Sequence, residues 1–133
     1  MSGPLALLLI VGLAVAGKIL ADRWRFRHYW RRSCTGRRWK ARFPESSARE
    51  IREFLTVFVD AFALGTSRRL KFEPDDQVLG VYRTRYPSGG ADMLELESLL
   101  KQLRKRFGVD LEKYWHPTIT LGEIFEMVSR RAA

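Results

Sequence analysis

The length and the charge of this chain already limit what it can be. It has 133 residues, a length typical of one domain, and a formal net charge of +9. Residues 1–43 hold ten Lys or Arg residues and one acidic residue, whereas residues 44–133 hold fourteen of each sign. The charge excess therefore lies in the N-terminal third, which excludes a folded basic nucleic-acid-binding domain as its explanation. Cys34 is the single cysteine, so neither an internal disulfide nor a cysteine-based zinc site is expected.

An apolar run opens the chain. No charged residue occurs from Gly3 to Gly17, and Lys18 is followed by three more apolar residues. A helix over residues 4–21 would span roughly 27 Å, close to the hydrocarbon core of a bilayer. Lys18 can reach the headgroups because it sits near the end of the run. We therefore expect residues 1–22 to form a transmembrane anchor.

Two other interpretations of this run are open. Residues 14–16, Ala-Val-Ala, resemble a signal-peptidase site. However, no Lys or Arg precedes the apolar run, and the basic residues lie on its far side, which favours an uncleaved helix. A buried core helix is disfavoured because the run has no polar face.

Aromatic and basic residues alternate directly after the apolar run, in residues 23–43. Aromatic rings at the interface with basic residues beyond them are typical of a cytoplasmic membrane flank. We expect a single-pass protein of the cytoplasmic membrane, with the N-terminus outside and the C-terminal domain in the cytoplasm.

The bilayer and its anionic lipids are the expected partner of residues 23–43. RNA is a formal alternative because aromatic rings can stack on bases, but lipid is favoured beside a bilayer, and nucleic acid is not the expected partner. The residues expected at the membrane surface are Lys18, Arg23, Trp24, Arg25, Arg27, Trp30, Arg31 and Arg32.

Residues 44–133 are expected to form a helical domain that begins at Phe43-Pro44, because the residue before proline resists helix. Three segments have the pattern of a helix start, with a side-chain cap followed by an acidic residue: Ser47–Glu50, Asp92–Glu95 and Thr120–Glu123. Leucine- and phenylalanine-rich stripes at helical spacing follow each start. Gly108 fits a left-handed C-terminal cap of the second of these helices.

The connections between these helices are less regular. Residues 74–76 are expected to open a short helix over Val78–Tyr82, and residues 86–90 to form a turn. A short turn with Trp115 is expected within residues 110–117. No segment alternates long enough to indicate a strand, so the predicted fold class is all-α.

The second half of the chain resembles a known family. Gly90-Ala91-Asp92-Met93-Leu94-Glu95-Leu96-Glu97, Leu99 to Phe107, and Thr118 to Ile124 resemble acyl carrier proteins in motif and spacing. The resemblance covers residues 46–129. It implies an acyl-carrier-like bundle of three to four helices behind the membrane helix, with the Asp-Met-Leu segment opening the motif helix.

The resemblance breaks at one position. Acyl carrier proteins attach phosphopantetheine to the serine after the motif aspartate, and here that residue is Met93. A thioether has no hydroxyl to esterify, so no cofactor is expected. A carrier modified elsewhere, at Ser88 or Ser98, is the alternative.

The same helix start is the candidate for binding an unidentified protein partner. Asp92, Met93, Glu95, Leu96 and Glu97 are the candidate partner-binding residues. Acidic side chains at the start of a helix are also stabilised by the helix dipole, so a purely structural role for these acids is open as well.

No combination of residues indicates catalysis or a metal site. His28 and His116 are far apart and lack an evident Ser or Cys partner, and the acidic pairs lack metal-loop spacing. We expect a non-enzymatic, membrane-tethered binding or scaffolding module. The alternatives are an unorthodox acyl carrier and a basic lipid- or RNA-binding membrane protein.

Overall fold

The computed structural model describes residues 3–87 and 93–132 of this protein, and these residues are helical with no β-strand among them. Backbone pairing outside helices includes an isolated antiparallel bridge between Gln77 and Thr120. The predicted all-α fold class is therefore confirmed. In chain order the elements are α1 (Gly3–Arg25), α2 (Arg27–Trp30), α3 (Gly36–Arg42), α4 (Ala48–Ala61), the 3₁₀ helix η1 (Thr66–Lys71), α5 (Val78–Arg85), α6 (Leu94–Phe107), the 3₁₀ helix η2 (Leu111–Lys113) and α7 (Leu121–Ala132).

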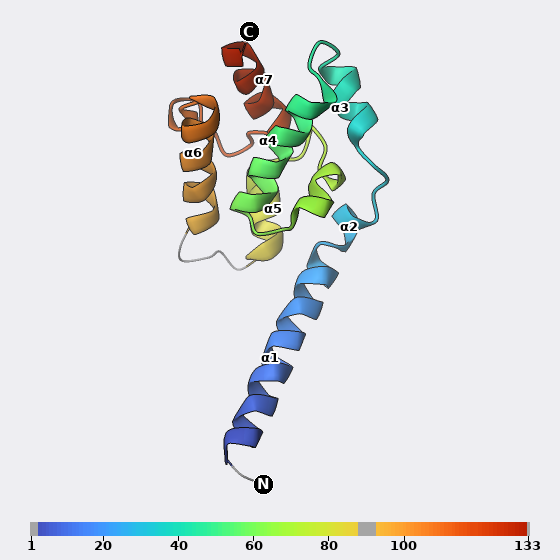
Figure 1. Cartoon of the computed structure of the whole chain (residues 1–133), viewed down its shortest axis with the longest axis vertical. Coiled ribbons are helices and arrows are strands. Elements are labelled where there is room, and N and C mark those ends of the chain that lie inside the picture. The colour runs from blue at the N-terminus through green and yellow to red at the C-terminus, as the bar shows by residue number, and fades with distance from the viewer. Residues whose placement is uncertain (1–2, 88–92, 133) are drawn as a thin grey trace.

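Helix α1 stands apart from the rest of the molecule. Figure 1 shows it projecting from one end of a cluster formed by the other helices. It is 23 residues long, and none of its residues is buried. By length and composition α1 could cross a membrane. This agrees with the expected anchor at the level of a candidate span, and the orientation stays a prediction.

Helix α4 runs through the centre of the helix cluster. The Ser47 hydroxyl accepts a hydrogen bond from the Glu50 amide at 3.1 Å, which is the capping contact that the sequence predicted. From this start, seven of the fourteen residues of α4 are buried, because its apolar residues recur at helical spacing. The buried residues of α4 are Ile51, Phe54, Leu55, Val57, Phe58, Val59 and Ala61.

The end of α6 and the start of α7 also lie where local chemistry predicts. Gly108 has φ 65° and ψ 22°, the left-handed conformation expected of a C-terminal cap. The Thr120 hydroxyl accepts a hydrogen bond from the Glu123 amide at 3.2 Å. Asp92 lies outside the described residues, as do Ser88 and the motif residues Gly90 and Ala91. Met93 precedes the first turn of α6 and makes no side-chain cap.

The packing of residues 26–43 differs from the prediction. Phe26, Tyr29 and Trp39 are buried in the same hydrophobic core as α4 and α7. Trp39 contacts Phe54 and Phe125 edge to ring, with centroids 6.1 and 5.7 Å apart. The domain boundary predicted at residues 43 and 44 therefore does not match the structure, because the core begins at Phe26.

Candidate functional site

The first turn of α6 displays apolar side chains to solvent. Met93 is 46% exposed and Leu94 is 61% exposed. Outside α1, the other large hydrophobic residue with comparable exposure among the described residues is Tyr114. Exposed apolar residues that lie together mark contact surfaces more often than isolated ones do. The start of α6 is therefore the leading candidate for a binding surface.

A pocket of about 290 Å³ continues from this turn along α6. Its walls come from α6, from η2 and from Trp115 shortly after η2, and the buried side chains of Leu96, Leu99 and Leu111 form its floor. Two carboxylates, Glu97 and Glu112, lie at its edge and are both exposed. We call this surface the α6 groove, and its lining residues are Met93, Leu96, Glu97, Leu99, Leu100, Leu111, Glu112 and Trp115.

The predicted partner-binding residues do not all face this groove. Met93, Leu96 and Glu97 line it, although Leu96 is itself buried. The Glu95 carboxylate instead accepts a hydrogen bond from the Tyr86 hydroxyl through Oε1. Its Oε2 is buried without a hydrogen-bond partner among the described residues. Glu95 therefore joins α6 to the end of α5 and is not displayed to a partner.

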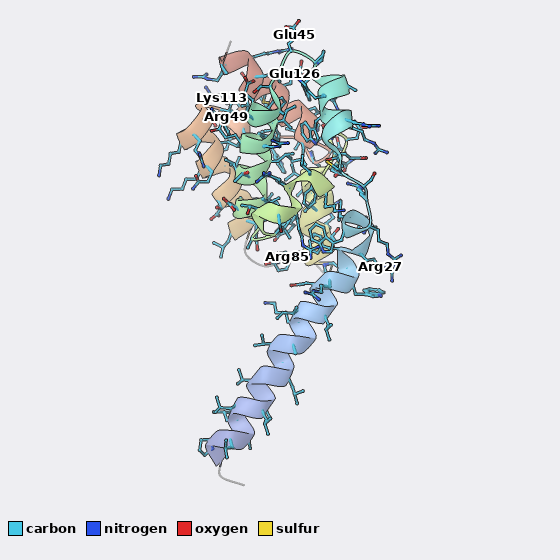
Figure 2. All side chains as sticks on the ribbon, turned by 45° about the vertical axis from the view of Figure 1, so that its right-hand side comes forward. Arg27, Glu45, Arg49, Arg85, Lys113 and Glu126 are labelled. Atoms are coloured by element: carbon cyan, nitrogen blue, oxygen red, sulfur yellow. The ribbon has the colours of Figure 1, made fainter. Side chains whose placement is uncertain are left out.

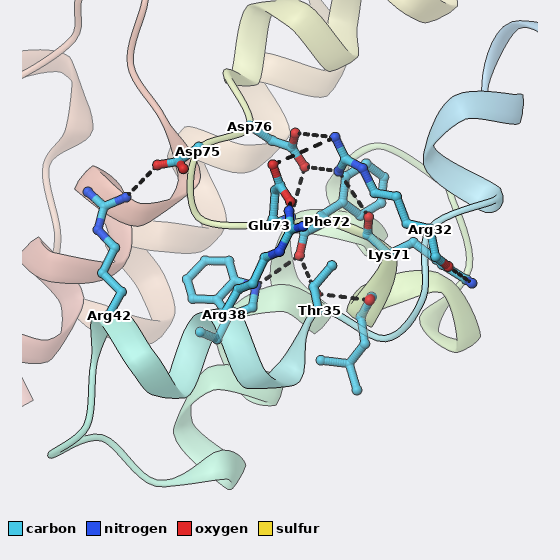
Figure 3. Close-up of polar contacts among 11 residues, drawn as sticks. Arg32, Thr35, Arg38, Arg42, Lys71, Phe72, Glu73, Asp75 and Asp76 are labelled. Atoms are coloured by element: carbon cyan, nitrogen blue, oxygen red, sulfur yellow. Dashed lines mark hydrogen bonds and ion pairs between the residues drawn. The ribbon is translucent and has the colours of Figure 1, made fainter.

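A second cluster of charged residues joins residues 32–42 to the turn at residues 73–76 (Figure 3). The Arg32 guanidinium donates to both carboxylate oxygens of Asp76, at 2.6 and 2.9 Å. The Glu73 amide donates to the same carboxylate at 2.8 Å. The hydrogen bond to Asp76 raises the pKa of Arg32 above its ordinary value. Such two-point arginine–carboxylate contacts fix geometry as well as neutralising charge.

Neighbouring residues extend this contact, which we call the clamp. The Thr35 hydroxyl donates to the Phe72 carbonyl at 2.7 Å, and the Trp39 indole N–H donates to the same oxygen at 2.8 Å. Arg42 pairs with Asp75 at 3.0 Å, and Arg38 pairs with Glu73. The clamp includes Arg32, Thr35, Arg38, Trp39 and Arg42 on one side, and Phe72, Glu73, Asp75 and Asp76 on the other.

Two residues predicted at the membrane surface, Arg32 and Trp30, instead pack against the domain. Arg32 is partly buried against Asp76. Trp30 packs partly buried against the core, edge to ring with Phe72 at 5.8 Å. Neither side chain extends freely from the surface as predicted, because acidic and aromatic partners in residues 70–76 hold both against the domain. Burial likewise raises the pKa of the neighbouring Tyr29 hydroxyl.

The other predicted surface residues lie at the end of α1 and directly after it. Lys18, Arg23, Arg27 and Arg31 are exposed. Trp24 is 64% exposed, and the Arg27 guanidinium lies 4.6 Å from the centroid of its ring. Figure 2 shows Arg27 projecting beside the upper end of α1. These side chains remain available for headgroup contact.

Arg25 is exposed but has a partner in the domain. Its guanidinium donates to the carbonyl of Arg85 at 3.3 Å, so it joins α1 to the end of α5.

A smaller polar group surrounds His116. The His116 ring nitrogens lie 2.7 Å from the Glu123 carboxylate and 3.1 Å from the Thr118 hydroxyl, in an exposed group. No group of three or more potential metal ligands occurs among residues 3–87 and 93–132. Cys34 is exposed.

Comparison with known proteins gave no match: no family model, curated protein or solved structure is significantly similar to this chain. The candidate sites are therefore identified from the contacts and burial of their own residues. The sequence contained a signal for the clamp, since Arg32, Arg38 and Arg42 precede an acidic turn containing Glu73, Asp75 and Asp76. Opposite charge in two segments does not by itself identify a contact, so the clamp was missed.

Proposed function

We propose that this protein is a membrane-tethered, non-catalytic, acyl-carrier-like module that binds a protein partner through the α6 groove. The resemblance of residues 46–129 to acyl carrier proteins supports the class of module. The order of the elements from α4 to α7 agrees with it: a long helix, a long connection, the motif helix, a short helix and a last helix. In this proposal Met93 replaces the attachment serine, and the module carries no phosphopantetheine.

The observation that carries the proposal is the α6 groove itself. Its apolar floor opens beside Met93 and Leu94, and carboxylates of Glu97 and Glu112 stand at its edge. Apolar area supplies most of the affinity of such contacts, and edge charges select the partner. A partner segment with apolar side chains and flanking basic residues fits this chemistry.

A membrane tether would raise the effective concentration of the module near a partner in the same membrane. Helix α1 would hold the module at the cytoplasmic face of the membrane, with the N-terminus outside, as the basic residues after α1 favour. A partner in the same membrane then meets the groove in a restricted volume, so modest affinity is sufficient for stable association.

Site-specific photo-crosslinking in cells tests the docking proposal. A photo-reactive residue replaces Glu97 at the groove edge and, as the matched control, Glu45 at the far end of the domain (Figure 2). We expect a discrete crosslinked species from position 97 that is absent from position 45. The substitution Met93→Lys should abolish it, because a charge then stands at the groove mouth. Equal crosslinking at both positions, or an unchanged product with Met93→Lys, would show that the groove is not the docking surface.

The carrier alternative has its own test. The full-length protein in detergent is incubated with coenzyme A and a broad-specificity phosphopantetheinyl transferase, and its intact mass is measured. The proposal expects an unchanged mass. The addition of one phosphopantetheine would overturn the argument from Met93, and would make Ser98 on α6 and Ser88 the first residues to replace.

A basic lipid- or RNA-binding function remains the third candidate. It predicts that RNA binds the full-length protein and is released by salt, since phosphate contacts are salt-sensitive. The clamp weakens this candidate, because it pairs Arg32, Arg38 and Arg42 with acids of the same chain.

A further inference from the structure

A small pocket lies where α1 meets the domain, and its chemistry differs from that of the α6 groove. Its volume is about 160 Å³, and its walls come from the end of α1, from α2, from the turn after α4, and from η1 and α5. Three arginines from three different elements line it: Arg23, Arg68 and Arg85. We call it the junction pocket.

Two of the three arginines are held in place by neighbouring groups. The Arg68 guanidinium lies over the Trp30 ring, 4.2 Å from its centroid. The Arg85 side chain is 19% exposed and donates to the Phe62 carbonyl. Because these two side chains are already positioned, an anion that enters the pocket need not order them, which lowers the entropic cost of binding.

The charges around the pocket do not cancel. Asp22 is the carboxylate in its lining, and its oxygen lies 3.8 Å from Arg85. With three guanidinium groups and one carboxylate, the lining keeps a formal charge of +2. Arginine is well suited to phosphate because its planar group offers paired donors to two oxygens.

The other walls of the pocket are apolar. Ile19 lies within the predicted membrane span, one residue after Lys18, and Leu64 belongs to the turn after α4. Figure 2 shows Arg85 at the end of the domain from which α1 leaves. The pocket therefore combines guanidinium groups with apolar walls at the domain end of the predicted membrane span.

We propose that the junction pocket binds the phosphate of an anionic phospholipid from the leaflet next to the domain, with the lipid chains along Ile19 and the outer face of α1. This inference rests on the proposed membrane tether. The lipid would bridge the anchor and the domain, because Arg23 belongs to α1 whereas Arg68 and Arg85 belong to η1 and α5. Basic pockets at the cytoplasmic side of membrane helices recognise headgroups by the same chemistry.

The test uses the full-length protein in a neutral detergent. Short-chain phosphatidylglycerol, phosphatidylcholine and inorganic phosphate are titrated separately, with binding followed by tryptophan fluorescence. Trp30 lines the pocket beneath Arg68, so the signal from bound lipid should disappear in a Trp30→Phe variant. We expect saturable binding of phosphatidylglycerol and at least tenfold weaker binding of the other two. Equal binding of inorganic phosphate would overturn the lipid assignment and leave a site for soluble anions.

Substitutions locate the site. Arg68→Gln should weaken phosphatidylglycerol binding about fivefold, and the Arg23→Gln, Arg68→Gln pair about 25-fold, since each basic residue near a lipid surface contributes about this factor. The charge-matched control is Arg49→Gln with Arg52→Gln, two exposed arginines on α4, of which Arg49 lies at the far end of the domain in Figure 2. Equal losses in both pairs would indicate net charge alone and would overturn the proposal. Arg85 is left intact because it also supports the domain through Phe62.

Alkaline extraction of membranes separates this inference from the tether on which it rests. Protein that stays in the membrane but binds no phosphatidylglycerol would overturn the junction-pocket proposal alone. Protein released into the alkaline supernatant would overturn the tether, and the lipid source with it.

Discussion

Trp24 and Trp39 lie in one stretch of alternating aromatic and basic residues, yet they have opposite environments. Trp24, at the end of α1, is 64% exposed, whereas Trp39, in α3, is 0% exposed. The first has Arg27 against its ring, and the second donates its indole N–H to Phe72 and packs on Phe125. Aromatic and basic residues after an apolar helix therefore do not mark a membrane flank along their whole length.

The difference arises from what lies elsewhere in the chain. Arg32, Arg38 and Arg42 meet acids in the turn at residues 73–76, so their charges are neutralised by the domain. Arg23 and Arg27 have no such turn beside them and stay exposed. The environment of each basic residue is decided by its tertiary partner.

Truncation should give the largest effect. A fragment of residues 22–133 should unfold cooperatively, whereas residues 44–133 should not fold. The shorter fragment loses Phe26, Tyr29 and Trp39, and three buried aromatic residues contribute roughly 5 to 9 kcal/mol against a total stability of roughly 5 to 15 kcal/mol. Thermal unfolding by circular dichroism distinguishes the two. Cooperative melting of residues 44–133 would restore the predicted boundary.

Substitution of the two tryptophans compares the two environments directly. Trp39→Ala should lower the free energy of unfolding by about 3 to 5 kcal/mol, because it leaves a cavity in the core. Trp24→Ala should change it by less than about 0.5 kcal/mol, because the ring is exposed. Denaturant titration of the full-length protein in detergent measures both. Similar losses in the two variants would contradict the contrast.

Two neighbouring aspartates test the clamp. Asp76→Asn should destabilise the domain by about 2 to 3 kcal/mol, since it removes charged hydrogen bonds to the partly buried Arg32. Asp75→Asn removes the same charge from an 85% exposed side chain and should cost less than about 1 kcal/mol. Chemical denaturation is the measurement, and equal effects would indicate that the clamp adds nothing beyond surface charge.

Two glycine substitutions compare the domain with α1, and their expected effects are smaller. A Cβ on Gly122 would stand 3.0 Å from the Pro74 carbonyl oxygen and 2.7 Å from the Arg42 guanidinium. Gly122→Ala should therefore cost about 1 to 3 kcal/mol through overpacking. Gly12 has no neighbouring atom within 4 Å of such a Cβ, so Gly12→Ala should leave the melting temperature of the domain unchanged.

Much of the helical domain was predictable, and the candidate sites were predictable only in part. Met93 and Glu97 were expected at a binding surface and do line the α6 groove. Glu95 is on the same turn but faces Tyr86, because a helix directs successive residues to different sides. The junction pocket had no sequence signal, since Arg23, Arg68 and Arg85 come from three elements that are distant in the chain.

The sequence by itself determined α1, α4, α6 and α7, because a continuous apolar run, apolar residues at helical spacing and caps such as Ser47 and Gly108 are local properties. The tertiary structure alone decided that residues 26–43 belong to the domain. An aromatic ring or an arginine can be satisfied by lipid, by water or by the protein interior, and the choice depends on which groups are nearby in space. Phe72 and Asp76 supply those groups here, more than thirty residues along the chain from the residues they hold.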